Sequence, residues 1–255
     1  MFVYQSRFLR RGEVWFNNEP TTKAVDWILY RNRSDPKPGA RWRYFFNRLI
    51  DLSKRVEELY SEMEIKTREK IRKAETVDKV TFEWRDLTSA RELDEIEQMW
   101  NQSEESQRRW GALNRVWLEE MLSAETLALA TAREPSGAAV VHSVFFKDTR
   151  RVQQLLSVSP FREWTTLENR SKTNRASCFL VWQVLLRLKA SGVTCFDFGG
   201  WYPGTDDIQL LGANAYKKSF GGQVVREFEC TQIKTLKGWM ALNAIQWINR
   251  GEKND

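Results

Sequence analysis

The stretch Cys195-Phe-Asp-Phe-Gly-Gly-Trp-Tyr202 indicates a buried strand that ends in two glycines. The apolar run 193–198 follows Gly192, a typical residue for the end of a helix, and its length fits a strand buried on both faces. A second stretch, Gly212-Ala-Asn-Ala-Tyr-Lys-Lys-Ser-Phe-Gly-Gly222, indicates a helix that runs into a glycine turn. Either glycine pair would let a backbone or a ligand approach closely, or would only satisfy the geometry of a turn.

Outward from these two stretches, the apolar pattern alternates between short strands and helices. Three runs separated by tight turns predict an antiparallel meander, and a helix then leads into the strand that begins at Val193. The predicted strands are 127–132, 138–146, 152–158, 193–198 and 224–230, and the predicted helices are 174–190, 210–219 and 233–249. A meander that feeds a strand–helix–strand unit predicts an α/β fold with a mixed, mostly antiparallel sheet flanked by helices.

The amino-terminal part adds two more predicted strands, 24–30 and 43–50, on either side of a proline-rich loop. Residues 1–50 are therefore expected to form a β-rich entry segment of the same domain. Residues 51–255 form its main part and end in the helix 233–249. The first helix of this main part is expected to begin after Ser53 and to run to about Ala74, because its apolar residues follow helical spacing.

The composition is that of a globular chain, with 255 residues of which 42% are hydrophobic and 29% are charged. The net charge of +6 suits an anionic partner such as a nucleotide, although a solvated basic surface would give the same value. Cys178, Cys195 and Cys230 lie far apart in apolar stretches and predict no disulfide framework. No apolar run is long enough to span a bilayer, so a soluble, cytoplasmic protein is expected.

Several common catalytic chemistries are excluded by the residues. His142 is the single histidine, which excludes a His-rich metal site, and we expect no metal. The chain contains no Walker loop, no Gly-x-Ser-x-Gly elbow and no Gly-x-Gly-x-x-Gly fingerprint. Acyl transfer from a thioester to an amine tolerates this lack, because the thioester is already activated. Such an enzyme must hold both partners close, remove a proton and stabilise an oxyanion.

The two glycine stretches, together with the helical stretch Thr67-Arg-Glu-Lys-Ile-Arg-Lys-Ala74, resemble the Fem-type branch of the GNAT superfamily. The resemblance extends over about 49–228 and is closest to the Fem-related N-acyltransferases of surface-polysaccharide (O-antigen or lipopolysaccharide) biosynthesis. It implies a GNAT fold, coenzyme A as the carrier of the acyl donor, and a nucleotide-linked amino-deoxysugar as the acceptor. The chain departs from the pattern at Val181, where the family often has a histidine, and at Ala213, where isoleucine is usual.

The resemblance and the residue types together give a set of candidate site residues. A bound water or one of three side chains would take the proton from the amine; these are His142, Asp197 and Asp207. Asp197 would alternatively only bond neighbouring backbone groups, and His142 would be an ordinary sheet residue. The expected start of the helix 174–190 is a natural anion site, so the pyrophosphate of coenzyme A is assigned to Ser157, Asn174, Arg175, Ala176 and Ser177. The acceptor is assigned to Arg68, Arg72, Gly199, Gly200, Tyr202 and Lys217, whose cations would otherwise be a solvated basic face.

Two other functions remain open. One is Fem-like transfer of an amino acid from aminoacyl-tRNA to a peptidoglycan or peptide amine, the only case in which a tRNA partner is expected; no DNA partner is expected. The other is a GNAT-derived binding module without catalysis. The last helix carries an apolar stripe with Lys234 and Lys237 beside it, which predicts either docking on the domain or peripheral contact with a membrane surface.

Overall fold

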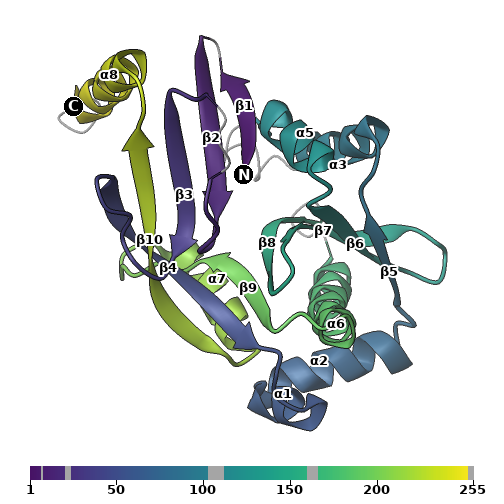
Figure 1. Ribbon diagram of the computed structural model, residues 1–255. Helices are drawn as coiled ribbons and strands as arrows, with labels where there is room; N and C mark the ends of the chain where they lie inside the picture. The colour runs from purple at the N-terminus through teal and green to yellow at the C-terminus, as the bar shows by residue number, and fades with distance from the viewer. Residues whose placement is uncertain (7, 21–23, 103–111, 160–165, 252–255) are drawn as a thin grey trace. The chain divides into compact units, whose positions relative to one another are not determined.

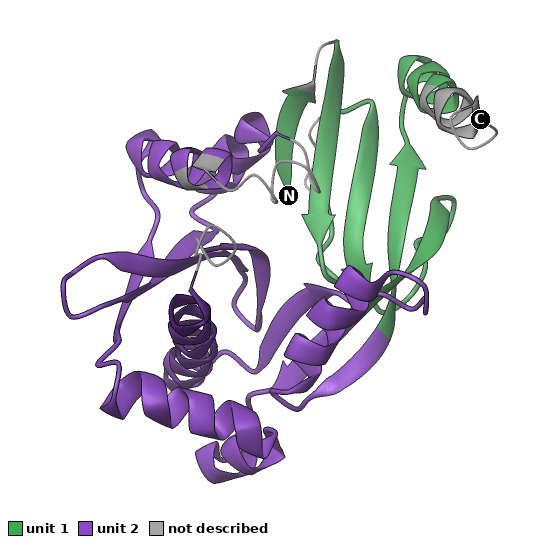
Figure 2. Ribbon diagram, turned by 180° about the vertical axis from the view of Figure 1, so that it is seen from behind, with its two compact units in different colours: residues 1–46, 226–255 green, residues 47–225 purple. Residues whose placement is uncertain are grey.

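The computed structural model describes residues 1–6, 8–20, 24–102, 112–159 and 166–251. The chain divides into two compact units, coloured green and purple in Figure 2. Unit 1 contains residues 1–46 and 226–255, and unit 2 contains residues 47–225. Two strands, β4 (Arg41–Asp51) and β10 (Gln223–Ile233), continue from one unit into the other. The division into residues 1–50 and 51–255 stays a prediction.

The strands of unit 2 are hydrogen-bonded in the order β4-β9-β8-β7-β6-β5. Their bounds are β5 (Thr81–Asp86), β6 (Leu127–Arg133), β7 (Ala139–Lys147), β8 (Arg151–Val158) and β9 (Cys195–Gly200). The meander β6–β7–β8 is antiparallel, as predicted, and only the pairing of β8 with β9 is parallel among these described strands. The predicted mixed, mostly antiparallel sheet is therefore confirmed (Figure 1).

Six helices flank these strands in the described part of unit 2. They are α1 (Val56–Glu62), α2 (Ile65–Thr76), α3 (Ala90–Gln102), α5 (Arg115–Ser123), α6 (Leu167–Ala190) and α7 (Ile208–Lys218). The core of the unit joins one face of α6 to the sheet, with Leu180, Leu185, Phe145 and Phe196 all nearly inaccessible to solvent. The helix α2 packs against α6 (Figure 1).

The single helix predicted after Ser53 is wrong. The chain forms two helices, because Met63 and Glu64 have extended backbones between α1 and α2. Met63 is buried in the core, so packing holds the chain extended where the helical pattern alone favoured continuation. Ser53 belongs to the preceding turn, where its main-chain N–H and its hydroxyl both donate to Asp51 Oδ1.

In unit 1 the strand order is β1-β2-β3-β10, with β1 (Phe2–Ser6), β2 (Leu9–Trp15) and β3 (Trp27–Arg33). The pairing of β2 with β3 is parallel, and β3 pairs antiparallel with β10. A small core of Val14, Val25, Ile28, Tyr30 and Cys230 covers one face. The helix α8 (Leu236–Gly251) follows β10, and no helix among the described residues is long and apolar enough to cross a membrane.

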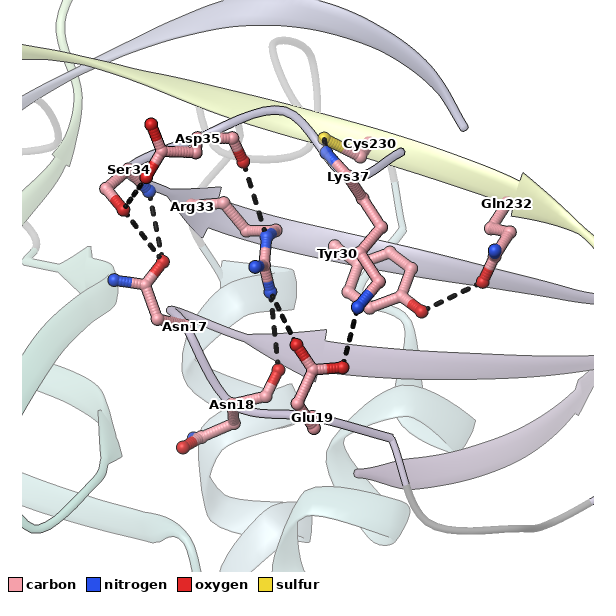
Figure 3. Close-up of polar contacts among 10 residues, drawn as sticks. All are labelled: Asn17, Asn18, Glu19, Tyr30, Arg33, Ser34, Asp35, Lys37, Cys230 and Gln232. Atoms are coloured by element: carbon pink, nitrogen blue, oxygen red, sulfur yellow. Dashed lines mark hydrogen bonds and ion pairs between the residues drawn. The ribbon is translucent and has the colours of Figure 1, made fainter. Parts of the chain in front are cut away.

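Polar contacts fix the loop that follows β3 (Figure 3). Lys37 Nζ donates to Glu19 Oε2 at 2.7 Å, and Arg33 lies 3.8 Å from the other oxygen of the same carboxylate. The main-chain N–H of Lys37 points to Cys230 Sγ at 3.4 Å, which ties the loop to β10. Cys230 is thus a packing residue of unit 1, and its sulfur has a structural contact.

Candidate functional site

The end of β9 is shaped by an extra residue. Asn47 of β4 pairs with Gly200, whereas Leu49 pairs with Asp197, so β9 has one more residue than β4 over this interval. Gly199 lies in this bulge with φ +72°, a left-handed conformation that favours glycine. A Cβ atom there would lie 3.2 Å from the carbonyl oxygen of Gln154 on β8. The first glycine of the motif is therefore required by backbone geometry.

Asp197 is fully buried on β9, and both of its carboxylate oxygens accept hydrogen bonds. Oδ1 accepts from the main-chain N–H of Gly199 at 2.7 Å. Oδ2 accepts from Arg151 Nη2 at 2.6 Å and from Nε at 3.1 Å, and the Arg151 side chain is 12% exposed. The sequence left this bonding role open for Asp197, but it did not identify Arg151, the largely buried partner of the carboxylate. Accepting a further proton would mean giving up part of this pair.

The helix α7 holds the loop after β9 at three points. Asn214, buried on α7, accepts from Tyr202 N–H at 3.1 Å and donates to the Tyr202 carbonyl at 2.7 Å. Lys217 Nζ donates to the carbonyl oxygen of Gly200. Asp207 caps the helix, because its Oδ1 accepts from the main-chain N–H of Leu210 at 2.9 Å. We name the group Asp197, Gly199, Gly200, Tyr202 and Lys217 the β9–α7 site.

Two members of this region were placed differently by the sequence analysis. Asn214 was missed. An asparagine inside a helix could have indicated a special role, because its side chain competes for the hydrogen bonds of the backbone. Asp207, predicted as a proton acceptor, is an exposed helix cap. Tyr202 lies beside it, and its hydroxyl donates to the neighbouring Asp206 carboxylate.

Lys217 is the titratable group of the β9–α7 site with a strongly perturbed pKa. Its side chain is half-buried, and burial lowers the pKa to about 8, against the opposing effect of the Asp197 carboxylate. The cause is the cost of keeping an ammonium group away from water. Lys217 therefore changes its charge close to neutral pH, whereas an ordinary lysine stays charged up to about pH 10.

A second glycine turn lies next to the site. Gly222 has φ +71°, and a Cβ atom there would lie 2.2 Å from the carbonyl oxygen of Leu49. Arg48 donates to the carbonyl oxygens of Gly221 and Gly222 at 2.8 and 3.0 Å, and its guanidinium lies 5.2 Å from the centre of the Trp201 ring. Gly222 is thus needed so that the backbone at Leu49 can approach this turn, whether or not a ligand binds there.

His142 lies elsewhere on the sheet. On β7 it pairs with Thr131 and with Val158, and its Nδ1 is 3.1 Å from the Thr131 hydroxyl. Val158 is five residues along β8 from Gln153, the partner of Asp197, which amounts to roughly 16 Å. Burial, then the positive charges of Arg133 and Arg85, lower the His142 pKa to about 4. The structure therefore does not bring His142 together with Asp197.

The predicted start of the long helix is wrong. The helix α6 begins at Leu167, and its cap is Thr166, whose Oγ1 accepts from Asn169 N–H at 3.2 Å. Four of the residues assigned to the cofactor lie inside this helix, so their N–H groups belong to its own hydrogen bonds; they are Asn174, Arg175, Ala176 and Ser177. The free helix end on which this assignment rested does not lie at these positions.

The side chains of these residues are also engaged. Arg175 donates to both oxygens of Asp78, at 2.5 and 2.7 Å, so its charge is paired. Ser177 Oγ donates to the carbonyl oxygen of Thr173, and Ala176 is buried in the core. Ser157, the fifth residue of the set, is exposed on β8, and its hydroxyl accepts from Ser143 Oγ at 3.0 Å.

Arg68 and Arg72 lie one turn apart on α2. The start of this helix is bonded to the end of α7, because Glu64 N–H donates to the Ser219 carbonyl at 2.9 Å. Arg68 is half-buried, with its guanidinium 5.8 Å from the centre of the Tyr60 ring and its Nε without a hydrogen-bond acceptor among the described residues. Arg72 is exposed. No group of three His, Cys, Asp or Glu side chains in the described part of the chain is placed to hold a metal ion.

No protein-family model matches the chain, and no curated protein matches it. Among solved structures, it is similar to the crystal structure of FemX, with 14% identity and a TM-score of 0.55 over 74% of this chain and 61% of FemX. It is also similar to the C-terminal domain (DUF2156) of a protein assigned as a lysylphosphatidylglycerol synthetase from Agrobacterium fabrum, with 15% identity and a TM-score of 0.52 over 84% and 70% of the two chains. The chain spans less than two thirds of FemX. This likeness shows the fold alone, and the predicted α/β fold with a mixed, mostly antiparallel sheet flanked by helices is confirmed.

Proposed function

We propose that the chain is a transferase that moves an acyl or aminoacyl group onto an amine at the β9–α7 site. The observation that carries the proposal is Lys217, a half-buried amine with a pKa of about 8 that donates to the Gly200 carbonyl beside the Gly199 bulge. An ammonium group carries three N–H donors, and this contact uses one of them. The others are available to a negative charge that forms on a substrate.

The reaction needs few protein groups. The neutral amine of the acceptor attacks the carbonyl carbon of the donor, a C–N bond forms, and the carbonyl electrons move to oxygen. The C–S bond of a thioester, or the C–O bond of an ester, then breaks, and the amine proton passes to water. Lys217 in its charged form stabilises the oxyanion, a contribution typically worth 10²–10³ in rate. Asn214 and Arg151 act one step away, by fixing the loop and the strand end that carry the site.

For the donor and the acceptor, we propose acyl-coenzyme A and a nucleotide-linked amino-deoxysugar of surface-polysaccharide biosynthesis. The support is the resemblance of the glycine motifs and the position of Arg68 and Arg72 on a helix whose start is bonded to the end of α7. The half-buried guanidinium of Arg68 suits a phosphate oxygen by its charge and shape. In the alternative module without catalysis, Lys217 would serve only as the contact that holds the Gly200 carbonyl.

Aminoacyl transfer is the second candidate, and the structural likeness favours it. FemX and the domain assigned to a lysylphosphatidylglycerol synthetase share the fold of this chain, and the second name denotes attachment of an amino acid to a lipid headgroup. An aminoacyl ester of tRNA would replace the thioester as donor. The role of Lys217 would be the same, because an ester carbonyl also passes through an oxyanion.

The test compares donors and lysines. Thiol release is measured with acetyl-coenzyme A and a UDP-linked amino-deoxysugar. Amide formation is measured with lysyl-tRNA and a peptide amine. With the active pair, Lys217→Ala should lower kcat by 10²–10³, while Lys218→Ala, which changes the exposed neighbour, should stay within about threefold.

The pH dependence shows how Lys217 acts. Because the wild-type ammonium loses its proton near pH 8, kcat should fall as the pH rises through about 8, and Lys217→Arg should remove this fall. If kcat of the wild type instead rises as the pH passes through 8, and the Lys217 variants lack this rise, Lys217 acts as a base. Turnover by Lys217→Ala within threefold of wild type contradicts the proposal for the site, and no turnover with either donor favours the binding module.

A further inference from the structure

Four large apolar side chains of unit 1 are exposed at one place in the chain's fold. Phe8, in the turn between β1 and β2, is 81% exposed. On the first turns of α8, Leu236 is 72% exposed, Trp239 50% and Met240 53%. Figures 1 and 2 both show the β1–β2 turn and α8 at the same end of the strands of unit 1. We name these four residues the Phe8–α8 surface.

A single carboxylate joins the turn to the helix. Asp26 Oδ2 accepts from the main-chain N–H of Arg10, next to the turn, at 2.9 Å. Its Oδ1 accepts from the Thr235 hydroxyl, just before α8, at 2.7 Å, and its main-chain carbonyl accepts from Lys234 N–H at 2.8 Å. The hairpin and the helix are therefore held by the same residue, and their exposed side chains keep a fixed relation.

Two further contacts tighten this junction. Lys237 Nζ donates to the carbonyl oxygen of Phe8, which connects the helix directly to the turn. Gly238 packs against the carbonyl of Asp26, where a Cβ atom would lie 2.4 Å from the oxygen. Hydrogen bonds thus fix the backbone that presents these apolar residues together, whereas one exposed apolar residue by itself, such as Val77 of unit 2, needs no explanation.

The two chain segments that carry the surface are basic, although the Asp26 carboxylate lies at their junction. Residues 1–12 contain Arg7, Arg10 and Arg11 and no acidic residue, and residues 230–251 contain Lys234, Lys237 and Arg250 and no acidic residue. Asp and Glu make up 34 of the 255 residues of the whole chain, so these two segments are depleted. Arg7 lies outside the described residues. The exposed lysines Lys234 and Lys237 flank the apolar side chains of α8.

We propose that the Phe8–α8 surface docks on the face of an anionic lipid bilayer. Tryptophan, phenylalanine and leucine partition to the boundary between headgroups and acyl chains, and lysines beside them reach the anionic headgroups. Only the side chains of the Phe8–α8 surface need to enter the bilayer, so this binding requires no membrane-spanning helix. The inference rests on unit 1 alone and is independent of the transferase activity, so either can fail without the other.

The experiment is co-sedimentation of the full chain with vesicles. Binding is expected to vesicles of phosphatidylglycerol and phosphatidylcholine, and to be at least tenfold weaker to phosphatidylcholine alone. Leu236→Ser should weaken binding to the anionic vesicles by about tenfold, because a leucine is removed from the boundary. Val77→Ser is the matched control in unit 2, since Val77 is 70% exposed, and it should leave binding unchanged.

Charge and apolar contributions are separated by two more variants. Lys234→Glu should weaken binding to anionic vesicles several-fold, while Lys73→Glu, which changes an exposed lysine of unit 2, should have little effect. The proposal is overturned if the wild-type chain does not sediment with anionic vesicles, or if Val77→Ser weakens binding as much as Leu236→Ser does. It is also overturned if poly(U) competes for the same lysines and Leu236→Ser has no effect, because the surface would then bind polyanions.

Discussion

Two buried aspartates organise two parts of the chain, Asp197 in unit 2 and Asp26 in unit 1. Each accepts a hydrogen bond from a main-chain N–H, from Gly199 at 2.7 Å and from Arg10 at 2.9 Å. They differ in the cation. Arg151 bonds Asp197 at 2.6 Å and is 12% exposed, whereas Lys237 lies 3.8 Å from Asp26 and is 52% exposed.

The two carboxylates therefore stabilise the structure in different ways: Asp197 through an ion pair and Asp26 mainly through neutral hydrogen-bond donors. At Asp197 the carboxylate is fully buried and Arg151 is largely buried, so each charge depends on the other. At Asp26 neutral donors do most of the bonding, since Thr235 and Arg10 N–H contact both oxygens. The contacts around Asp26 can therefore form next to solvent, and the exposed side chains of the Phe8–α8 surface stay accessible to a partner.

The largest effect is expected from breaking the buried pair. Asp197→Asn keeps the shape but leaves Arg151 as a buried charge without its counter-ion, which should lower the free energy of unfolding by about 3–5 kcal/mol. Urea denaturation measures this change. Asp207→Asn is the control, because asparagine caps a helix as well as aspartate does, and it should change stability by less than about 0.5 kcal/mol. Equal effects of the two variants would show that the Asp197 pair is not the critical contact.

Each region also contains a glycine against a carbonyl oxygen, which allows a graded comparison. Gly222→Ala should cost about 2–4 kcal/mol, because the new Cβ meets Leu49 and φ is positive. Gly238→Ala should cost about 1–2 kcal/mol, because overlap with Asp26 is partly offset by the better helix propensity of alanine. Gly212→Ala, on α7 with open space around it, should be neutral or stabilising. A stabilising Gly238→Ala would mean that α8 does not pack on Asp26.

The smallest effect is expected at Asp26, and it depends on pH. Hydrogen bonds from Arg10 N–H and then from Thr235 lower the Asp26 pKa, so its stabilisation is present above the unfolded pKa of about 3.9 and is lost as the pH falls through the folded pKa. Asp26→Asn should therefore cost about 1–2 kcal/mol at pH 7 and much less at a pH below the lowered pKa of Asp26. Urea denaturation at both pH values measures this. Asp35→Asn, at an exposed aspartate of the same unit, should show no such convergence, and a constant difference at Asp26 would exclude the carboxylate as the cause.

The sequence predicted the sheet because its signals were local. The meander 127–158 alternates apolar residues between tight turns, and the glycine motif at 199–200 coincides with a positive-φ bulge. The start of α6 was missed because the six residues after Leu167 are polar and give no apolar period. The strand β2 was missed because Arg10 and Arg11 interrupt its apolar alternation, and β1 was missed because it has only five residues and ends in the polar Gln5 and Ser6.

The candidate site depended on contacts that sequence spacing cannot give. Arg151 and Asp197 are 46 positions apart, and Asn214 reaches Tyr202 over 12. The Lys217 pKa follows from burial, which only packing determines. Lys217 itself was identified from the motif, whereas the cofactor assignment of Asn174 to Ser177 rested on a helix start that lies seven residues earlier.

The two segments that make up unit 1 have a consequence for the order of folding. The Tyr30 hydroxyl bonds Gln232, 202 positions later, and β3 pairs with β10 along this line. During synthesis, β3 can therefore pair with β10 only after about 200 further residues have been made. Residues 47–225 of unit 2 are complete before that. Long-range strand pairing of this kind is slow to form, so nascent chains should spend a defined interval with unit 2 ordered and an open edge on β3, the interval in which chaperones are needed most.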